Sequence, residues 1–210
     1  MTRMSEIRSS PGEPASAGRR RRADAERSRT AVLDAATKLL GERPDASMDA
    51  IAAAAGVTRQ TVYAHYPSRE VLLAAVVDRI SAEALAAIDA VGLDEGPAVD
   101  ALLRLVEASW QTFERYPLLL RIAPGELDPS ADHERHEPVA DRLLRLIRRG
   151  QRAGEIDRGL RPAWLVTAVI ALGHAAGEEV RSGRMSARAA TAALRVSLVR
   201  LLGAQDHSPR

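Results

Sequence analysis

Polar side chains are concentrated in one short stretch of the sequence. Thr58, Arg59, Gln60 and Thr61 follow one another directly. Arginine pairs bidentately with guanine and glutamine with adenine, while hydroxyl groups can bind either base. Hydroxyl, imidazole and guanidinium donors nearby suit phosphate oxygens. We therefore predict base contacts from Arg59, Gln60 and Thr61, and phosphate contacts from Ser47, Thr58, Tyr63, His65 and Arg69.

Two short helices joined by a tight turn are predicted to position these side chains. Ser47 can cap the first helix, because its hydroxyl accepts from the free amides of the first turn. Gly56 stands where the helix would end in a left-handed residue, and Thr58 can cap the second helix. Pro67 stops that helix and Ser68 caps the next one. This is a helix-turn-helix arrangement, whose second helix enters the major groove of DNA.

The run IAAAAGVTRQTVYAHYPSREVLL resembles the DNA-binding domain of the TetR family of bacterial transcriptional regulators. The resemblance extends from about Asp24 to Asp78 and includes the Tyr-x-His-Tyr ending and the Pro-Ser-Arg-Glu start of the next helix. It implies an all-α protein with an N-terminal three-helix DNA-binding domain and a C-terminal helical domain for ligand binding and dimerisation. The alternative is an Ala-rich helical hairpin of another all-α protein, which leaves the Thr-Arg-Gln-Thr run unexplained.

Three regions follow from this interpretation. Residues 1–22 are expected to form a disordered basic arm, residues 23–80 the DNA-binding domain with its helix-turn-helix at about 47–66, and residues 81–205 the regulatory domain. The arm ends in four arginines, 19–22, which could act as a solubilising tail or could contact phosphates or the minor groove. Asp24 is predicted to cap the first helix.

Helical periodicity continues along the rest of the chain. A helix is expected at about 68–90, with Val71, Leu72, Ala75, Val76 and Ile80 on its inner side. Further helices are expected from Pro97 to Tyr116, around 139–150, at 164–180 and from Ser186 to about Leu202. Residues 123–138 contain too many Pro, Gly, Asp and Ser residues to predict a regular element. The last two helices carry many small residues, and the resemblance implies that they form the homodimer contact.

Composition limits the function classes. The chain has 210 residues and no cysteine, so disulfide and thiolate chemistry are excluded. No apolar run is long enough to cross a membrane, and the basic N-terminus lacks the apolar segment of a secretory signal, so we expect a cytoplasmic protein. Residues 1–75 hold 12 basic and 9 acidic side chains, whereas residues 76–210 hold 18 and 19. The excess of positive charge lies at the predicted DNA-binding end.

The resemblance also implies a cavity for a small-molecule effector in the C-terminal domain. Its expected lining is Trp110, Phe113, Leu119, Trp164 and His174, although each is equally well explained as ordinary core or interface. No cofactor is expected. His133 and His136 stand beside carboxylates, but they lie in a Pro- and Asp-rich stretch without a second ligand cluster, so we predict no metal site.

The sequence thus predicts a sequence-specific regulator that binds a near-palindromic double-stranded DNA operator as a homodimer. We expect a repressor, released from DNA by its effector, and no enzymatic activity. Three alternatives remain: a transcriptional activator of the same family, a ligand-sensing helical protein that does not bind DNA, and an all-α enzyme that uses the His133/His136 region.

Overall fold

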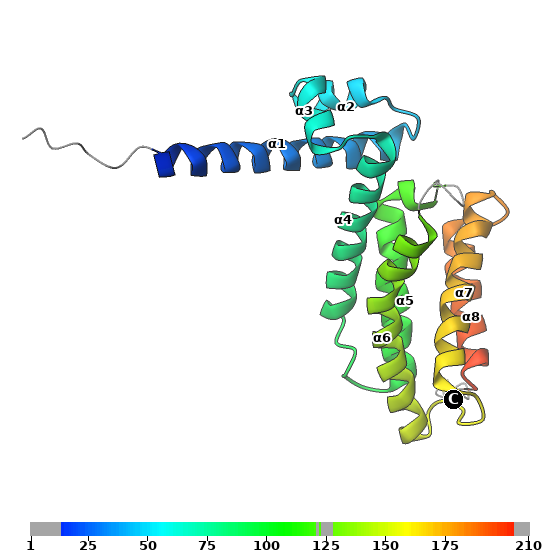
Figure 1. Ribbon diagram of the computed structural model, residues 1–210. Helices are drawn as coiled ribbons and strands as arrows, with labels where there is room; N and C mark the ends of the chain where they lie inside the picture. Colours follow the sequence, from blue (N-terminus) through cyan, green and yellow to red (C-terminus); the bar gives the residue numbers. More distant parts are fainter. Residues whose placement is uncertain (1–13, 121, 123–127, 204–210) are drawn as a thin grey trace, which may run out of the picture.

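The computed structural model describes residues 14–120, 122 and 128–203. Within these ranges the chain forms eight α-helices and one short 3-10 helix, with no strand (Figure 1). The elements are α1 (Pro14–Glu42), α2 (Met48–Ala55), α3 (Arg59–His65), α4 (Arg69–Ala90), α5 (Ala98–Arg115), η1 (Pro117–Leu120), α6 (Pro129–Ala153), α7 (Pro162–Arg181) and α8 (Ala187–Leu201). The predicted all-α fold is confirmed. No helix of the described part is long and apolar enough to span a membrane.

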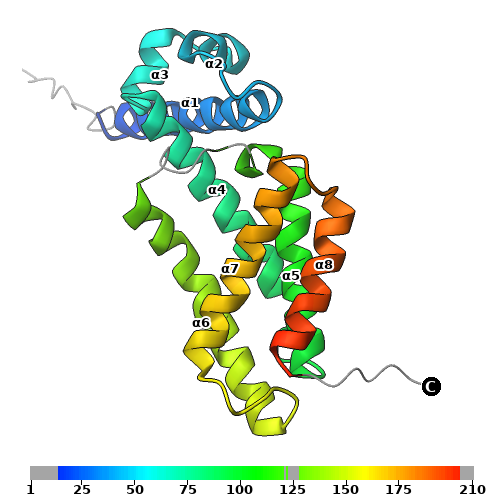
Figure 2. The ribbon, with the colours of Figure 1, turned by 90° about the vertical axis from the view of Figure 1, so that its right-hand side faces the viewer.

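The molecule has a head, residues 14–80, that sits across one end of a body, residues 81–203 (Figures 1 and 2). The head core joins α1, α2, α3 and the first half of α4. Its central side chains, among them Val32, Ile51, Val62 and Val76, are fully buried. Burying a side chain of this size contributes roughly 1.5–3 kcal/mol, so a few such residues hold short helices that would be unstable alone.

Helix α1 begins earlier than the sequence predicted. Residues 14–22, expected to be disordered, are helical, and Asp24 lies inside the helix rather than at its start. Alanine and arginine have high helix propensity, so this segment needs no apolar face to be helical. It therefore projects away from the head as a free helical end (Figure 1). Residues 1–13 of the predicted arm lie outside the described residues.

Helix α4 runs from the head into the body. Its residues Val76 and Ile80 belong to the head core, whereas Ile88 is buried in the body core. Val71, predicted on the inner side, is 47% exposed and does not contribute to the core. The body core packs α5 against α6, α7 and α8, and its fully buried side chains include Leu102, Ile147, Leu165 and Leu198.

Helix α6 corrects a second expectation. Residues 129–138, predicted to be irregular, form its first turns, so only residues 123–127 of that stretch lie outside the described part. The side chain of Asp128 caps the helix by accepting from the Ser130 amide at 2.8 Å, and Pro129 occupies the first turn, where no amide donor is required. The cap at Asp128 and the proline after it therefore start a helix in a stretch whose overall composition predicted an irregular segment.

Candidate nucleic-acid interface and effector cavity

The predicted capping pattern forms the helix-turn-helix. Ser47 accepts from the Ala50 amide at 3.2 Å and Thr58 accepts from the Thr61 amide at 3.1 Å. Gly56 ends α2 with φ of 67°, a conformation that costs a residue with a Cβ about 1–2 kcal/mol. Val62 is completely buried against the head core, which fixes the rotation of α3 about its axis. The opposite side of α3 faces outwards as a result.

The outward side of α3 carries the predicted base-reading residues. Thr58, Arg59 and Gln60 are exposed, Thr61 is half-buried, and Tyr63 is 37% exposed. The Arg59 guanidinium bonds to Asp49 at 2.8 Å and lies over the Tyr63 ring at 5.3 Å from its centroid. Both side chains of the ion pair are more than half exposed, so exchanging Asp49 for another partner costs about 1 kcal/mol or less.

Besides Thr58, three of the predicted phosphate-binding residues make contacts within the head. Arg69 donates to the carbonyl oxygens of Pro44 and Ala46, which ties the start of α4 to the loop before α2. A ring nitrogen of His65 lies 2.7 Å from the Ser28 hydroxyl, which links α3 to α1. The Ser47 hydroxyl serves as a helix cap. The Ser47 cap was predicted, whereas the contacts by which His65 and Arg69 help to position the recognition helix were not indicated by the sequence.

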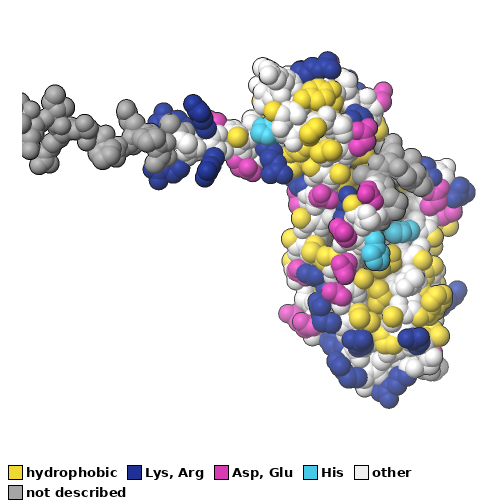
Figure 3. Space-filling view, viewed as in Figure 1, with side chains coloured by type: hydrophobic (Ala, Val, Ile, Leu, Met, Phe, Trp, Pro, Cys, Tyr) yellow, Lys and Arg dark blue, Asp and Glu magenta, His cyan; other side chains and the backbone are white. Residues whose placement is uncertain are grey.

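The projecting end of α1 is basic. Arg19, Arg20, Arg21 and Arg22 are all exposed, and Arg29 is exposed nearer to the head. Figure 3 shows these positive side chains gathered along the free helix. The structure therefore presents the predicted arginine cluster on a helix rather than on an irregular tail.

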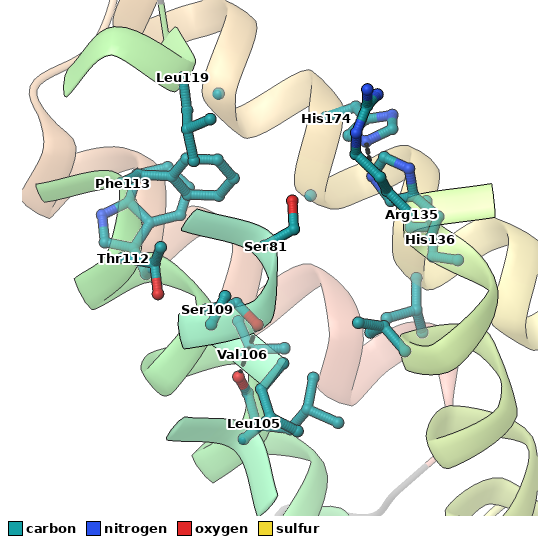
Figure 4. Close-up of a pocket in the computed structure, with 18 of the residues that line it drawn as sticks. Ser81, Leu105, Val106, Ser109, Thr112, Phe113, Leu119, Arg135, His136 and His174 are labelled. Atoms are coloured by element: carbon teal, nitrogen blue, oxygen red, sulfur yellow. Dashed lines mark hydrogen bonds between the residues drawn. The ribbon is translucent and has the colours of Figure 1, made fainter. Parts of the chain in front are cut away.

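The body contains a cavity of about 640 Å³ lined by side chains from α4, α5, α6, α7 and α8, and by Leu119 of η1 (Figure 4). A volume of this size accommodates a drug-sized molecule. Its walls are mostly aliphatic and aromatic, and Trp110 and Phe113 meet edge to face with ring centroids 5.8 Å apart. The remaining apolar walls come from Val77, Ile88, Leu105, Val106, Leu119, Ile122, Val139, Leu143, Val169, Ile170 and Leu194.

Four of the five residues expected to line a cavity do line it: Trp110, Phe113, Leu119 and His174. Trp164 does not, since it lies at the start of α7 on the outer surface and is 59% exposed. Hydrophobicity alone placed it inside, but its position on the helix points it away from the body core. Arg135 and His136 also line the cavity, although the sequence did not indicate it, because they fall in the stretch interpreted as irregular.

Comparison with known proteins agrees with the head geometry. The family model described as bacterial regulatory proteins, tetR family, matches residues 32–76. The chain is 45% identical over 83 residues, 40% of its length, to the HTH-type transcriptional repressor LfrR of Mycolicibacterium smegmatis, and covers 44% of that protein. It is 40% identical over 70 residues to the HTH-type transcriptional regulator EthR of Mycobacterium tuberculosis, covering 32% of each chain. It thus spans less than half the length of these curated relatives.

A solved structure extends the likeness into the body. The crystal structure of LfrR from Mycobacterium smegmatis in complex with proflavine matches with a TM-score of 0.59 and 29% identity. The match covers 83% of this chain and 96% of that one. The DNA-binding region of the chain, residues 32–76, thus matches the TetR family. This match confirms the resemblance predicted from the helix-turn-helix residues.

Helices η1 and α4 connect the cavity to the head. Leu118 of η1 is buried in the head core, while its neighbour Leu119 lines the cavity and contacts the head core. Val77 of α4 lines the cavity, whereas Val76, one residue earlier, lies in the head core. The cavity wall is therefore in direct contact with the head core, whose packing sets the orientation of α3. A change in the shape of the cavity can reach α3 through these contacts.

Polar contacts reinforce the same connection. Arg79 of α4 bonds to Asp34 of α1 and to Glu83 one turn further along α4. The Tyr116 hydroxyl, at the end of α5, donates to Glu83. This hydrogen bond lowers the pKa of the Glu83 carboxyl below its ordinary value, and the nearby Arg79 lowers it further, although partial burial opposes both. The head, α4 and α5 are thus joined by one chain of ion pairs and hydrogen bonds.

Proposed function

We propose that the protein is a transcriptional repressor that binds a near-palindromic double-stranded DNA operator as a homodimer. The observation that carries the proposal is the exposed Thr58–Thr61 run at the start of α3, held outwards by two side-chain caps and by buried Val62. The N-terminal residues of a recognition helix are the ones that meet base edges. Arg59, Gln60 and Thr61 would contact bases, and Thr58 and Tyr63 would contact phosphates together with Ser47, His65 and Arg69.

The outer side of α7 and α8 supports the homodimer. Trp164 is 59% exposed and Val196 is 50% exposed. Exposed alanines continue both stripes at helical spacing, at Ala171 and Ala175 on α7 and at Ala189 and Ala193 on α8. An apolar surface of this kind indicates a contact between proteins. Pairing two copies here as a four-helix bundle would place two α3 helices on one side, as successive major grooves about 34–36 Å apart require.

A small-molecule effector in the cavity would release the DNA. It can do so only if it binds one arrangement of the two heads better than the other. Support comes from η1 and α4, which contribute side chains both to the cavity and to the head core. The related LfrR holds proflavine, which shows that a relative with this fold accepts a small aromatic molecule. Because the partner is DNA, we place the protein in the cytoplasm.

The alternatives are weighed on the same observations. An activator would use the same head and differs only in the outcome at the promoter. A sensing protein without DNA binding would not require the exposed Arg59–Gln60 pair. The enzyme hypothesis used His133 and His136 together. His136 lies at the cavity beside His174, whereas His133 is exposed. In the described part of the chain no group of three or more His, Cys, Asp or Glu side chains could hold a metal.

Fluorescence anisotropy on labelled DNA from the protein's own upstream region tests the proposal. Wild type should bind that DNA more tightly than a scrambled sequence at physiological salt. Arg59→Ala should weaken operator binding by about 1–3 kcal/mol and relax the sequence preference, because a bidentate contact with a base is lost. Arg145→Ala, which removes an exposed arginine from α6 in the body, is the control. Equal loss on both DNAs would make Arg59 a phosphate contact instead.

Sedimentation velocity tests the homodimer. Val196→Arg should convert the dimer to monomer at micromolar concentration, because it buries an unpaired charge in the proposed contact. Val71→Arg introduces the same charge at an exposed valine of α4, outside that contact, and should leave the dimer intact. A wild-type protein that sediments as a monomer would contradict this part of the proposal.

A further inference from the structure

The outward surface of α2 and α3 carries a negative side chain beside the predicted base-reading residues. Asp49 lies in the first turn of α2, and its Oδ2 atom accepts at 2.8 Å from Nη1 of Arg59, in the first turn of α3. The side chains of Asp49 and Arg59 are 57% and 63% exposed, so both are accessible to DNA. A carboxylate on such a surface repels the phosphates of every DNA sequence alike. Asp49 therefore lowers affinity for DNA in general unless its contact with Arg59 compensates.

The position of Asp49 at the start of α2 accounts for its charge only in part. An acidic side chain in the first turn of a helix is stabilised by the partial positive charge of that end. This interaction leaves the direction of the carboxylate open, whereas here the carboxylate joins two helices, because its partner Arg59 belongs to α3. Asp49 thus acts on Arg59 as well as on its own helix.

The Arg59 guanidinium is held by two side chains. Asp49 accepts from Nη1, and the Tyr63 ring lies against the group, with its centroid 5.3 Å from Cζ. A cation within about 6 Å of the centroid is attracted to the face of an aromatic ring. Residues i and i+4 of a helix share one side, so Tyr63 is placed to make this contact. Together the two contacts restrict a long side chain that is otherwise exposed to water.

These contacts leave the guanidinium able to read a base. A guanidinium carries five N–H donors, and a two-point contact with guanine uses two of them. Because the bond to Asp49 is made by Nη1 alone, guanine can be bound without displacing the carboxylate. When DNA excludes water from the ion pair, the attraction between its two charges becomes stronger. A phosphate, in contrast, has to compete with Asp49 for the same cation.

We propose that Asp49 is a positioning residue for Arg59, which directs the guanidinium towards base edges and keeps it from binding the phosphates of any sequence. This inference rests on the proposed function, since it concerns the DNA-reading surface of α3. Asp49 raises the preference for the operator in two ways: it fixes Arg59 before the specific complex forms, and it weakens binding to all other DNA. Specific recognition commonly combines such an attractive and a repulsive element.

Anisotropy titrations of Asp49→Ala on two DNAs test the inference. The first is the sequence that the wild type enriches most strongly from a random pool, and the second is a scrambled version of it. Affinity for the scrambled DNA should rise by about two- to threefold and its salt slope should steepen by about one unit, because Arg59 becomes free to bind a phosphate. The ratio of the two affinities should fall by about three- to tenfold, since Arg59 must then be ordered on binding.

Two controls separate a positioning role from a structural one. Asp45→Ala removes an exposed carboxylate from the loop before α2 and should leave the ratio unchanged. In an Arg59→Ala background, Asp49→Ala should change neither the ratio nor the salt slope, because no guanidinium remains to be held. Tighter binding to the scrambled DNA also shows that Asp49→Ala is folded, since a damaged head would bind both DNAs more weakly.

Two results would overturn the inference. One is an unchanged ratio in Asp49→Ala, including weaker binding to both DNAs by the same factor, which would leave Asp49 with a structural role alone. The other is a fall in the ratio that is equally large when Arg59 is absent. Either result, with a wild type that prefers its selected sequence, rejects only the role of Asp49. A wild type that enriches no sequence rejects the DNA-binding proposal itself, and this inference with it.

Discussion

The head and the body of this protein are specified over different distances along the chain. In the head, Ser47, Gly56, Thr58 and Ser68 each act within three or four residues of their own position, and together they set the directions of α2, α3 and α4. In the body, the cavity is formed by side chains from five helices that are up to about a hundred residues apart. A short sequence motif can therefore specify a DNA-reading surface, whereas the ligand-binding surface depends on how whole helices pack.

The comparisons follow the same division. The family model matches only residues 32–76, all within the head. The structural likeness to LfrR continues through 83% of the chain at 29% identity. The body thus keeps its architecture while most of its side chains differ, as expected of a region whose cavity can be relined without changing the fold.

The largest effect that we predict for the head comes from the basic end of α1. Replacing Arg19, Arg20, Arg21 and Arg22 with glutamine should weaken binding to all DNA and make it less sensitive to salt. If all four contact phosphates, the wild type should lose on the order of 100-fold more affinity than the variant between 50 and 200 mM salt. Anisotropy titrations across this range measure the slope.

The control variant removes the same number of positive charges, but from the body instead of from α1. Replacing the exposed Arg145, Arg148, Arg152 and Arg188 with glutamine should leave the salt slope unchanged. If both variants lower the slope equally, α1 would have no special role and the positive charge of the whole protein would account for binding.

Gly150 tests the packing of the body. A Cβ at this position would lie 2.9 Å from the Ala98 Cβ and 2.6 Å from a side-chain carbon of Ile156, so α5 and α6 would have to separate. We expect Gly150→Ala to lower the free energy of unfolding by about 1–3 kcal/mol, the usual cost of overpacking. Urea denaturation followed by circular dichroism measures the change.

Gly41→Ala in the head is the control, because a Cβ there meets nothing within 4 Å. It should stabilise the protein slightly, since alanine favours a helix by about 0.5–1 kcal/mol over glycine. A stable Gly150→Ala variant would show that α5 and α6 do not pack as closely as the structure indicates.

The contact between Glu83 and Tyr116 gives the smallest predicted effect. The pKa of Glu83 is lowered in the folded protein, so its ionised form stabilises the fold above its ordinary pKa of 4.5. This contribution is lost as the pH falls from 4.5 through the folded value. Glu83→Gln should therefore reduce thermal stability at pH 7, and the difference from wild type should shrink at acidic pH.

Thermal melts at several pH values measure this difference. Glu107→Gln, at an exposed position of α5, serves as the control and should follow the wild type at every pH. A constant difference between Glu83→Gln and wild type from pH 7 to pH 3 would show that the charge of Glu83 is not the source of its contribution.

Much of the fold could be predicted, because it depends on signals that act over a few residues. The caps at Ser47, Thr58 and Ser68 formed as expected. The starts of α1 and α6 were predicted wrongly, and the reasons again lie in the residues around each start. Residues 14–22 have helix-forming composition but no apolar face, and the Asp128–Pro129 start of α6 was hidden among other polar residues.

The candidate sites were predictable only in part. The position of α3 follows from the motif, but the internal bonds of His65 and Arg69 reach α1 and the loop before α2, which no local pattern reveals. Trp164 was placed inside because it is hydrophobic, yet a second molecule can cover such a residue as well as a core can. Arg135 and His136 become visible as cavity residues only once α6 packs beside α7.

Selection from random-sequence DNA tests the central claim most directly. The purified wild-type protein, carried through several rounds at physiological salt, should enrich a near-palindrome whose half-sites are about one helical turn or more apart. The Arg59→Ala/Gln60→Ala variant, run in parallel, should enrich a weaker and less defined site. If the wild type enriches no sequence, the head does not read DNA and the sensing-only alternative becomes the better account.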